Sequence, residues 1–169
     1  MRPYQWASLQ KLNMIENLPK RKMLPHNVPS WLTQSPVYFI TVCTTPKGEN
    51  QLCKEQISEK LWESAYFYME KGDWWIYCFL LMPDHVHALI GLSMKAGLND
   101  SVTSWKRYTA RNLKINYQRD FFDHRLRREE SIINKTQYIL NNPVRAALVD
   151  SYEEWPYYWG FNSNGKSIR

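Results

Sequence analysis

The sequence predicts an α+β fold built on an antiparallel sheet, and three observations lead to this class. Segments 37–44, 74–82 and 85–92 are rich in β-branched and aromatic residues, which is typical of strands. Segments 58–71 and 98–118 repeat their apolar residues at helical spacing and fall between those strands. With one further short strand, the order becomes β-α-β-β-α-β. This order is the ferredoxin-like split βαβ arrangement, whose helices cover one face of the sheet.

The first half of the chain gives each element its own signal. Strand 37–44 reads V-Y-F-I-T-V-C-T, and a loop containing Pro, Gly and Asn follows it. Helix 58–71 is followed by Gly72, the residue type that best suits the left-handed position after a helix. Segment 74–82 is apolar throughout, as expected of a strand that is buried on both faces. The dipeptide Pro83-Asp84 turns the chain, so the next strand returns beside this one.

The second half adds one strand and one helix. Helix 98–118 leads into 121–127, the predicted fourth strand. A third helix spans 129–142 and should end at Pro143, which lacks the N–H that a helix interior needs. Because the six preceding elements complete the sheet, this C-terminal helix is free to pack elsewhere and to carry a site.

Length and composition limit the number of domains that the chain can form. A chain of 169 residues fits one domain, and 44% hydrophobic with 15% aromatic residues excludes a disordered protein. We expect a basic N-terminal extension over 1–36, the folded domain over 37–160 and a tail over 161–169. The three cysteines show no C-x-x-C spacing, which fits reduced thiols better than a disulfide framework or a zinc knuckle.

The charge balance points to a polyanionic partner. A net charge of +6 favours nucleic acid first and an anionic membrane surface second. The first 25 residues hold no apolar signal segment. The apolar stretch 74–92 is interrupted by Pro83-Asp84 and two histidines, so inserting it into a bilayer would be costly. We therefore expect no membrane partner and a cytoplasmic, nucleoid-associated protein.

Two histidines begin the strand 85–92. Side chains alternate along a strand, so His85 and His87 point to one face while Val86 and Ala88 point to the other. Two imidazoles placed in this way can bind one divalent cation. The alternative is a pair of histidines hydrogen-bonded at a sheet surface, which an H-x-H pattern alone favours. Their position in an otherwise apolar strand strengthens the metal hypothesis, because unpaired polar groups are costly there.

Tyr138 lies on the polar side of the predicted third helix. At 100° per residue, the arc expected to face the core holds Ile132, Ile133, Thr136, Ile139 and Leu140. Tyr138 lies nearly opposite, and Asn142 lies directly beside it, four residues further on. A phenol nucleophile next to an amide oxygen that can bind a metal is one interpretation. A tyrosine packed on the C-terminal aromatic residues is an equal alternative.

A basic region follows the histidines. Residues 101–128 hold eight Lys or Arg residues against two Asp residues, which favours a phosphate-tracking surface over an ordinary solvated helix face. Tyr108 and Tyr117 in the same region are candidates to stack on unpaired bases. The residues predicted to contact DNA are Lys106, Arg107, Arg111, Lys114, Arg125, Arg127 and Arg128.

With these residues placed, the sequence resembles the REP-associated tyrosine transposases. They belong to the wider group of single-tyrosine, insertion-sequence-like transposases with a His-hydrophobic-His motif. The resemblance covers residues 37–160 in the family's order and spacing. It is carried by L-M-P-D-H-V-H-A-L-I (81–90), F-F-D-H-R-L-R (121–127), Q-Y-I-L-N-N-P-V-R-A-A-L-V (137–149) and W-P (155–156).

The resemblance implies an enzyme that cuts single-stranded DNA at or near hairpins formed by repetitive extragenic palindromes. His85 and His87 match the metal-binding pair, Tyr138 matches the nucleophile, and Asn142 falls where relatives place a polar third ligand. The implied cofactor is Mg²⁺ or Mn²⁺, and the implied intermediate is a 5′-phosphotyrosine with a free 3′-OH. A phenol has a pKa of about 10, so the metal or a local base must help to deprotonate it. Relatives act as monomers or as homodimers, so both states stay open.

Two other functions stay open on the sequence. The chain could be a domesticated protein that binds a hairpin in nucleic acid without cutting it, although the intact His85, His87 and Tyr138 argue against this. It could also be an unrelated metal-dependent hydrolase that uses the histidine pair. A binding protein would show no metal-dependent cleavage, and a hydrolase would form no covalent link to DNA and would tolerate Tyr138→Phe.

Overall fold

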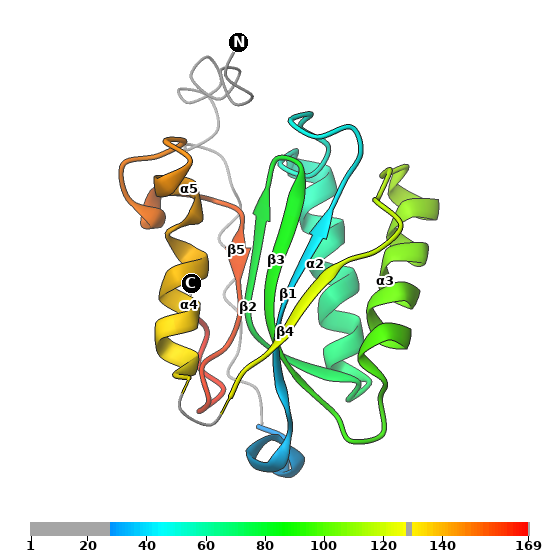
Figure 1. Cartoon of the computed structure of the whole chain (residues 1–169), viewed down its shortest axis with the longest axis vertical. Helices are drawn as coiled ribbons and strands as arrows, with labels where there is room; N and C mark the ends of the chain where they lie inside the picture. The colour runs from blue at the N-terminus through cyan, green and yellow to red at the C-terminus, as the bar shows by residue number, and fades with distance from the viewer. Residues whose placement is uncertain (1–27, 128–129, 169) are drawn as a thin grey trace.

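The computed structural model describes residues 28–127 and 130–168. Its strands form one antiparallel sheet in the order β4-β1-β3-β2-β5 (Figure 1). The first four strands in this order are the ferredoxin-like sheet, so the predicted fold is confirmed. The elements are η1 (Ser30–Gln34), β1 (Val37–Cys43), α2 (Glu55–Glu70), β2 (Trp74–Met82), β3 (His85–Leu92), α3 (Leu98–Leu113), β4 (Phe122–Arg125), α4 (Ile132–Leu140), α5 (Asn142–Arg145), η2 (Tyr152–Glu154) and β5 (Tyr158–Trp159).

The helices form two layers, one on each side of the sheet. Helices α2 and α3 pack side by side on one face, whereas α4 contacts β2 and β3 from the opposite face (Figure 1). The short helix α5 follows α4 on that second side. The C-terminal helix thus lies apart from the two helices of the βαβ repeats, which is the arrangement that the element order predicts.

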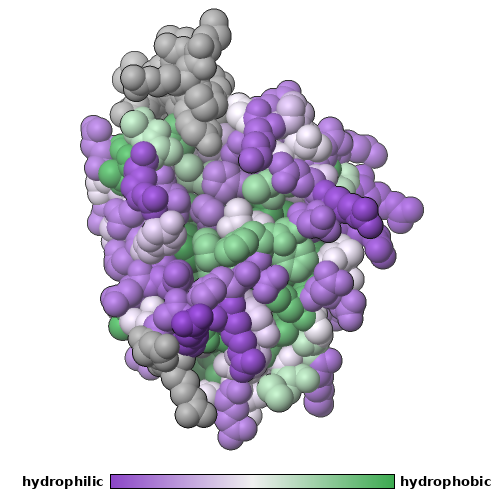
Figure 2. All heavy atoms as spheres, in the orientation of Figure 1, coloured by the Kyte–Doolittle hydropathy of each residue, from purple (hydrophilic) through white to green (hydrophobic). Residues whose placement is uncertain are grey.

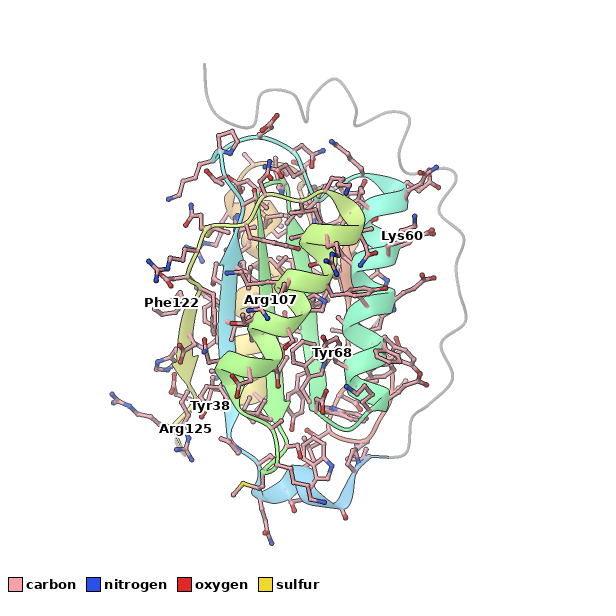
Figure 3. The ribbon with its side chains drawn as sticks, turned by 90° about the vertical axis from the view of Figure 1, so that its right-hand side faces the viewer. Tyr38, Lys60, Tyr68, Arg107, Phe122 and Arg125 are labelled. Carbon is pink, nitrogen blue, oxygen red and sulfur yellow. The ribbon has the colours of Figure 1, made fainter. Side chains whose placement is uncertain are left out.

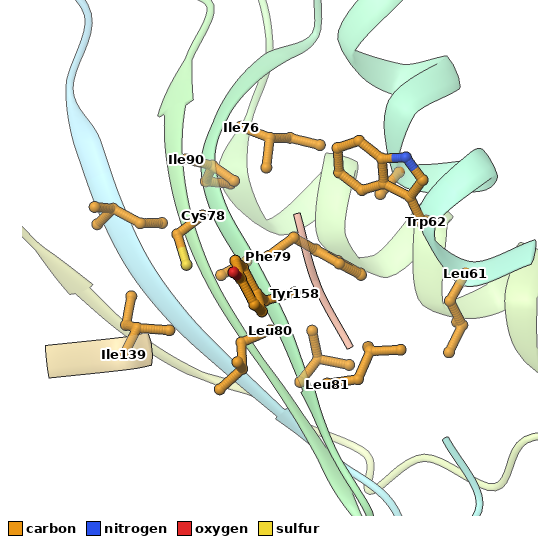
Figure 4. Packing of buried hydrophobic residues seen from close by; sticks show 14 of the residues in the cluster. Leu61, Trp62, Ile76, Cys78, Phe79, Leu80, Leu81, Ile90, Ile139 and Tyr158 are labelled. Atoms are coloured by element: carbon orange, nitrogen blue, oxygen red, sulfur yellow. The ribbon is translucent and has the colours of Figure 1, made fainter. Parts of the chain in front are cut away.

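The core lies on both sides of β2, whose nine residues are all buried. Toward α2 and α3, the ring of Phe79 packs against Trp62 and Trp105. Toward α4, Ile139 packs beside Cys78 and Leu80, as the close view shows (Figure 4). Burial of large apolar side chains on both faces of this strand stabilises the domain by the hydrophobic effect.

The predicted helix boundaries differ from the structure at several points. Helix α2 spans Glu55–Glu70 rather than 58–71, and α4 ends at Leu140 rather than at 142. Helix α3 ends at Leu113 rather than at 118, because Lys114 takes a left-handed backbone with φ 57°. Helix α4 starts at Ile132 rather than at 129, where the Ser131 hydroxyl caps it by accepting from the Asn134 amide. Pro143 lies in the first turn of α5, a position in which its missing N–H costs nothing.

Both ends of the described chain contribute to the core. Leu32 of η1 is buried although it falls within the predicted extension, and Phe161 is buried although it falls within the predicted tail. The domain limits at 37 and 160 stay a prediction, and residues 1–27 of the extension lie outside the described residues. Within the described ranges, no helix is both long and apolar enough to cross a bilayer.

Candidate active site

His85 and His87 lie on the face of β3 that looks toward α4. On the neighbouring strand β1, Thr41 pairs with His87, and the Thr41 hydroxyl oxygen lies 2.9 Å from His87 Nδ1. The two imidazole rings are 4.6 Å apart between centroids, and their Nε2 atoms approach to 3.2 Å. The predicted alternation along the strand therefore brings both imidazole nitrogens to one point.

An aspartate that the sequence analysis treated only as a turn residue orients the first histidine. Asp84 Oδ1 lies 2.6 Å from His85 Nδ1, and Asp84 Oδ2 accepts from the Gly48 amide at 2.7 Å. A carboxylate only accepts, so the His85 proton sits on Nδ1 and the Nε2 lone pair faces His87 Nε2, 3.2 Å away. The position of Asp84 directly before H-V-H is the signal that could have identified it.

The surroundings of His87 favour its neutral ring. Burial, together with the nearby His85 and Arg145, lowers the pKa of His87 from 6.5 to about 3. Burial alone would raise the pKa of Asp84, but hydrogen bonds from His85 and Gly48 outweigh it and hold that pKa below its usual value. Near neutral pH the carboxylate is charged and the His87 imidazole is neutral, which is the form that binds a cation.

The donor set fits a divalent cation. Two ligands at right angles, each about 2.1 Å from a cation, lie about 3 Å apart, and the Nε2 atoms are 3.2 Å apart. Within residues 28–127 and 130–168, no cluster of three or more His, Cys, Asp or Glu side chains could hold a metal. The remaining ligands would therefore have to be amide, water or substrate oxygens, which suit Mg²⁺ and Mn²⁺.

Asn142, the predicted third ligand, lies at the junction of α4 and α5. Its amide nitrogen donates to the carbonyl oxygens of Tyr138 at 3.1 Å and Ile139 at 2.9 Å. Since carbonyls only accept, Oδ1 is the atom left for a cation. The structure thus confirms that Asn142 lies next to Tyr138, and its role as a metal ligand stays a prediction.

Tyr138 lies on α4 with 48% of its surface exposed, as expected for the polar side of this helix. Its ring packs perpendicular to Phe39 of β1, with 6.5 Å between centroids. The Phe39 ring is also 5.4 Å from the ring of His87. The Phe39 side chain therefore contacts both Tyr138 and His87 on one face of the sheet. The predicted core arc was wrong at Ile133, which is 73% exposed.

Two cations flank the tyrosine ring, and neither was predicted as a site residue. Arg145 of α5 places its Cζ 4.8 Å from the Tyr138 ring centroid. Lys135 Nζ lies 5.5 Å from the same ring and 5.6 Å from the ring of Phe39. Glu130 anchors this group, because its carboxylate lies 3.0 Å from His124 Nε2 and 3.9 Å from Lys135 Nζ. The contact therefore ties His124 of β4 to the segment that leads into α4.

Comparison with known proteins identifies the family. Residues 36–138 match the family model described as IS200-like transposase. This chain belongs to the IS200-like transposase family. It is 26% identical over 143 residues to a Haemophilus influenzae protein described as a REP-associated tyrosine transposase, covering 74% of this chain and 80% of that protein. The predicted resemblance is therefore confirmed.

The transposase fold is also that of a solved relative. The chain superposes with a TM-score of 0.64 and 17% identity on the structure of a REP-associated tyrosine transposase bound to a REP hairpin. The match covers 83% of this chain and 82% of the other. At this identity the comparison supports the shared fold.

One predicted DNA-contacting residue of the transposase is placed differently. Lys106 is buried, and its ammonium group donates to the carbonyl oxygens of Gln118 at 2.9 Å, Arg119 at 2.8 Å and Asp120 at 3.3 Å. The prediction that it faces outward on α3 was wrong, because the segment after α3 folds back over that side of the helix. Lys106 holds this segment in place, and its donors are already used.

The other basic residues of α3 are exposed, but far from the histidines. Arg107 and Arg111 are exposed on α3, and Lys114 is exposed directly after it. Figure 3 shows Arg107 on the outer side of that helix. This helix lies on the face of the sheet opposite α4. The predicted basic surface and the candidate active site therefore lie on opposite sides of the sheet, with the β4 edge between them.

The remaining predicted contacts follow that edge. Arg125 is exposed at the end of β4 and Arg127 is exposed just after it, whereas Arg128 lies outside the described residues. Of the predicted stacking residues, Tyr108 is 55% exposed on α3. Tyr117 is instead partly buried, and its hydroxyl accepts from Thr109 at 3.2 Å.

Proposed function

We propose that this transposase is a metal-dependent, single-tyrosine endonuclease and strand transferase that acts on single-stranded DNA beside palindromic hairpins. One observation carries the proposal. The two Nε2 atoms of the histidine pair lie 3.2 Å apart on the sheet face to which Phe39 joins the exposed Tyr138. A binding protein has no need for this combination of converging nitrogens and an adjacent phenol.

In the proposed reaction, the Tyr138 oxygen attacks the phosphorus of one phosphodiester. The bond from phosphorus to the 3′ oxygen breaks, which leaves a 5′-phosphotyrosine on the protein and a 3′-OH on the released strand. The phenol loses its proton and the 3′ oxygen gains one. Attack by a 3′-OH on the phosphotyrosine reverses the step and joins strands without a nucleotide cofactor. His85 and His87, with Asn142 Oδ1, would hold the divalent ion, which polarises the phosphate when bound.

Arg145 and Lys135 serve the same step. Both cations lie within 6 Å of the Tyr138 ring, at 4.8 and 5.5 Å from its centroid. A cation over an aromatic ring holds it in place and favours any negative charge that the ring acquires. We assign the two residues to positioning the nucleophile and stabilising its oxygen during attack.

The proposed substrate is a hairpin with unpaired flanks. The superposed relative is described as bound to a REP hairpin, and the net charge of +6 suits a phosphate backbone. The cut strand must be locally unpaired, because base pairing would fix the scissile phosphate in duplex geometry. We therefore assign hairpin binding to the exposed basic residues, and cleavage of the unpaired flank to the histidine pair and Tyr138.

The experiment that tests this function uses a labelled oligonucleotide with a palindromic hairpin from beside the protein's own gene. The protein is incubated with it in Mg²⁺ or Mn²⁺ and analysed on a denaturing gel. A labelled band at the mass of protein plus DNA, absent in EDTA, is the expected result. DNA that shifts on a native gel but stays uncut in every metal would indicate the binding protein instead.

Arg145→Gln is expected to slow adduct formation about tenfold at saturating DNA, because the cation nearest the ring is lost. A single-turnover time course on the same oligonucleotide measures this rate. Lys60→Gln removes the same charge from an exposed site on α2, across the sheet, and should change the rate by less than about twofold (Figure 3). Equal rates for the two variants would contradict the assignment of Arg145.

Arg111→Ala is expected to weaken hairpin binding and to reduce the slope of log K against log salt by about one unit. Because α3 lies across the sheet from the histidines, the cleavage rate at saturating DNA should stay unchanged. Fluorescence anisotropy over a salt series measures the slope. An unchanged slope would remove Arg111 from the phosphate contacts and confine DNA to the α4 side.

A further inference from the structure

We propose that Phe122 is a stacking platform for one unpaired base of the DNA, next to the phosphodiester that is cut. The inference rests on the proposed function and adds a subsite to it. Phe122 is the first residue of β4, the edge strand of the sheet, and 60% of its surface is exposed. A large aromatic residue exposed at a sheet edge forgoes burial, and it offers a face that any base can stack on.

The register places Phe122 on the same face as the histidines. Phe122 pairs with Thr41 across β4 and β1, and Thr41 pairs with His87 across β1 and β3. Residues paired across neighbouring strands point to the same side of the sheet, so Phe122, Thr41 and His87 form one row. Since strands lie about 4.8 Å apart, Phe122 and His87 are separated by about 10 Å. At a rise of about 3.4 Å per nucleotide, that span covers at most about three nucleotides.

Phe39 connects this platform to the nucleophile. Its ring lies edge-on to Phe122 at 6.3 Å and edge-on to Tyr138 at 6.5 Å. Phe122 is thus held by a neighbour, so stacking costs it little conformational entropy. The three aromatic rings and the histidine pair form one connected series of ring contacts, which runs from the candidate active site to the β4 edge of the sheet.

The charges around the row suit a strand of DNA. Lys135 lies over Phe39 and Tyr138, and Arg145 lies over Tyr138, so the cations are on the α4 side of the row. If the phosphate backbone of the DNA lies on the α4 side, a base can point toward Phe122 at the β4 edge. Figure 3 shows Phe122 at the edge of the sheet, away from α3. On the face with β4 in front, apolar surface gathers at the centre within a hydrophilic surround (Figure 2).

The test combines substitutions in the protein with single abasic sites in the DNA. Hairpin oligonucleotides carry one abasic residue at each unpaired flanking position in turn, and binding is measured in the Tyr138→Phe background to prevent cleavage. Phe122→Ala should weaken binding of the intact oligonucleotide about 5- to 100-fold, whereas Phe122→Trp should keep it. One abasic position should weaken binding to a similar extent with Phe122 and have no further effect with Phe122→Ala.

Phe67→Ala is the matched control, because Phe67 is 57% exposed on α2, in the layer across the sheet. It should bind the intact oligonucleotide within about twofold of the parent protein. The inference fails if Phe122→Ala binds equally well, or if the abasic penalty is unchanged at every position. It also fails if Phe122→Ala only dissociates a dimer in sedimentation, which would make the edge a protein contact. An adduct formed by protein with an intact Tyr138 in any of these cases leaves the proposed function standing.

Discussion

His87→Ala is expected to reduce DNA cleavage at least about a thousandfold while hairpin affinity falls by less than about tenfold. The imidazole supplies one of two nitrogens that converge within 3.2 Å, and a single remaining histidine holds a divalent ion poorly. We expect hairpin affinity to depend mainly on basic residues elsewhere on the surface. Single-turnover cleavage and anisotropy on the same oligonucleotide measure the two quantities. Equal loss of cleavage and binding would contradict the division of roles.

Thr41→Val provides a graded companion to this variant. It keeps the side-chain shape but removes the hydroxyl that lies 2.9 Å from His87 Nδ1. Loss of such an outer partner typically lowers metal affinity or activity about 10- to 100-fold. Cleavage by Thr41→Val should recover as Mn²⁺ is raised, whereas cleavage by His87→Ala should not. If raised Mn²⁺ restored cleavage by both variants, or by neither, the His87 imidazole would not act by binding the metal.

Tyr138→Phe is expected to abolish the protein–DNA adduct and leave hairpin binding within about twofold. The substitution removes one oxygen and keeps the ring that packs on Phe39 and under Arg145. Since 48% of the residue is exposed, folding should be unaffected, and a thermal melt checks this. A denaturing gel reports the adduct. Continued cleavage without an adduct would favour a hydrolase that uses the histidine pair.

A mixture of Tyr138→Phe and His87→Ala proteins tests which chain supplies the tyrosine. Helix α4 packs on the sheet of its own chain, so we expect Tyr138 to serve the histidines of the same chain. The mixture should then form no more adduct than the sum of the two variants alone. Adduct formation restored in the mixture would show that the active site is shared between two copies.

The sheet was predictable because its central strands carry strong local signals. Strand β2 is apolar at every position, and β3 follows it after a two-residue turn. The weaker elements depend on tertiary contacts. Strand β4 covers four residues, rather than the seven predicted, and none of them is buried, so its apolar pattern is faint. The two residues of β5 are too few to show a periodic pattern. They form a strand only because they pair with β2.

The site was predictable only where one element determines it. The two-residue period of a strand is enough to put His85 and His87 on one face. Helical spacing likewise predicts which side of α3 carries Lys106. It cannot show that the segment after α3 folds over that side and buries the ammonium group. Arg145 and Phe39 join the site through the packing of α4 and α5 on the sheet, a contact between distant parts of the chain.

The central claim is a 5′-phosphotyrosine on Tyr138, and peptide mapping of the adduct tests it most directly. Trypsin should release Thr136–Arg145, which contains Tyr138 as its sole tyrosine. After the DNA is trimmed with nuclease, this peptide should carry a nucleotide through its 5′ phosphate, and the released strand should end in a 3′-OH. A nucleotide on any other peptide, or a linkage through a 3′ phosphate, would contradict the mechanism.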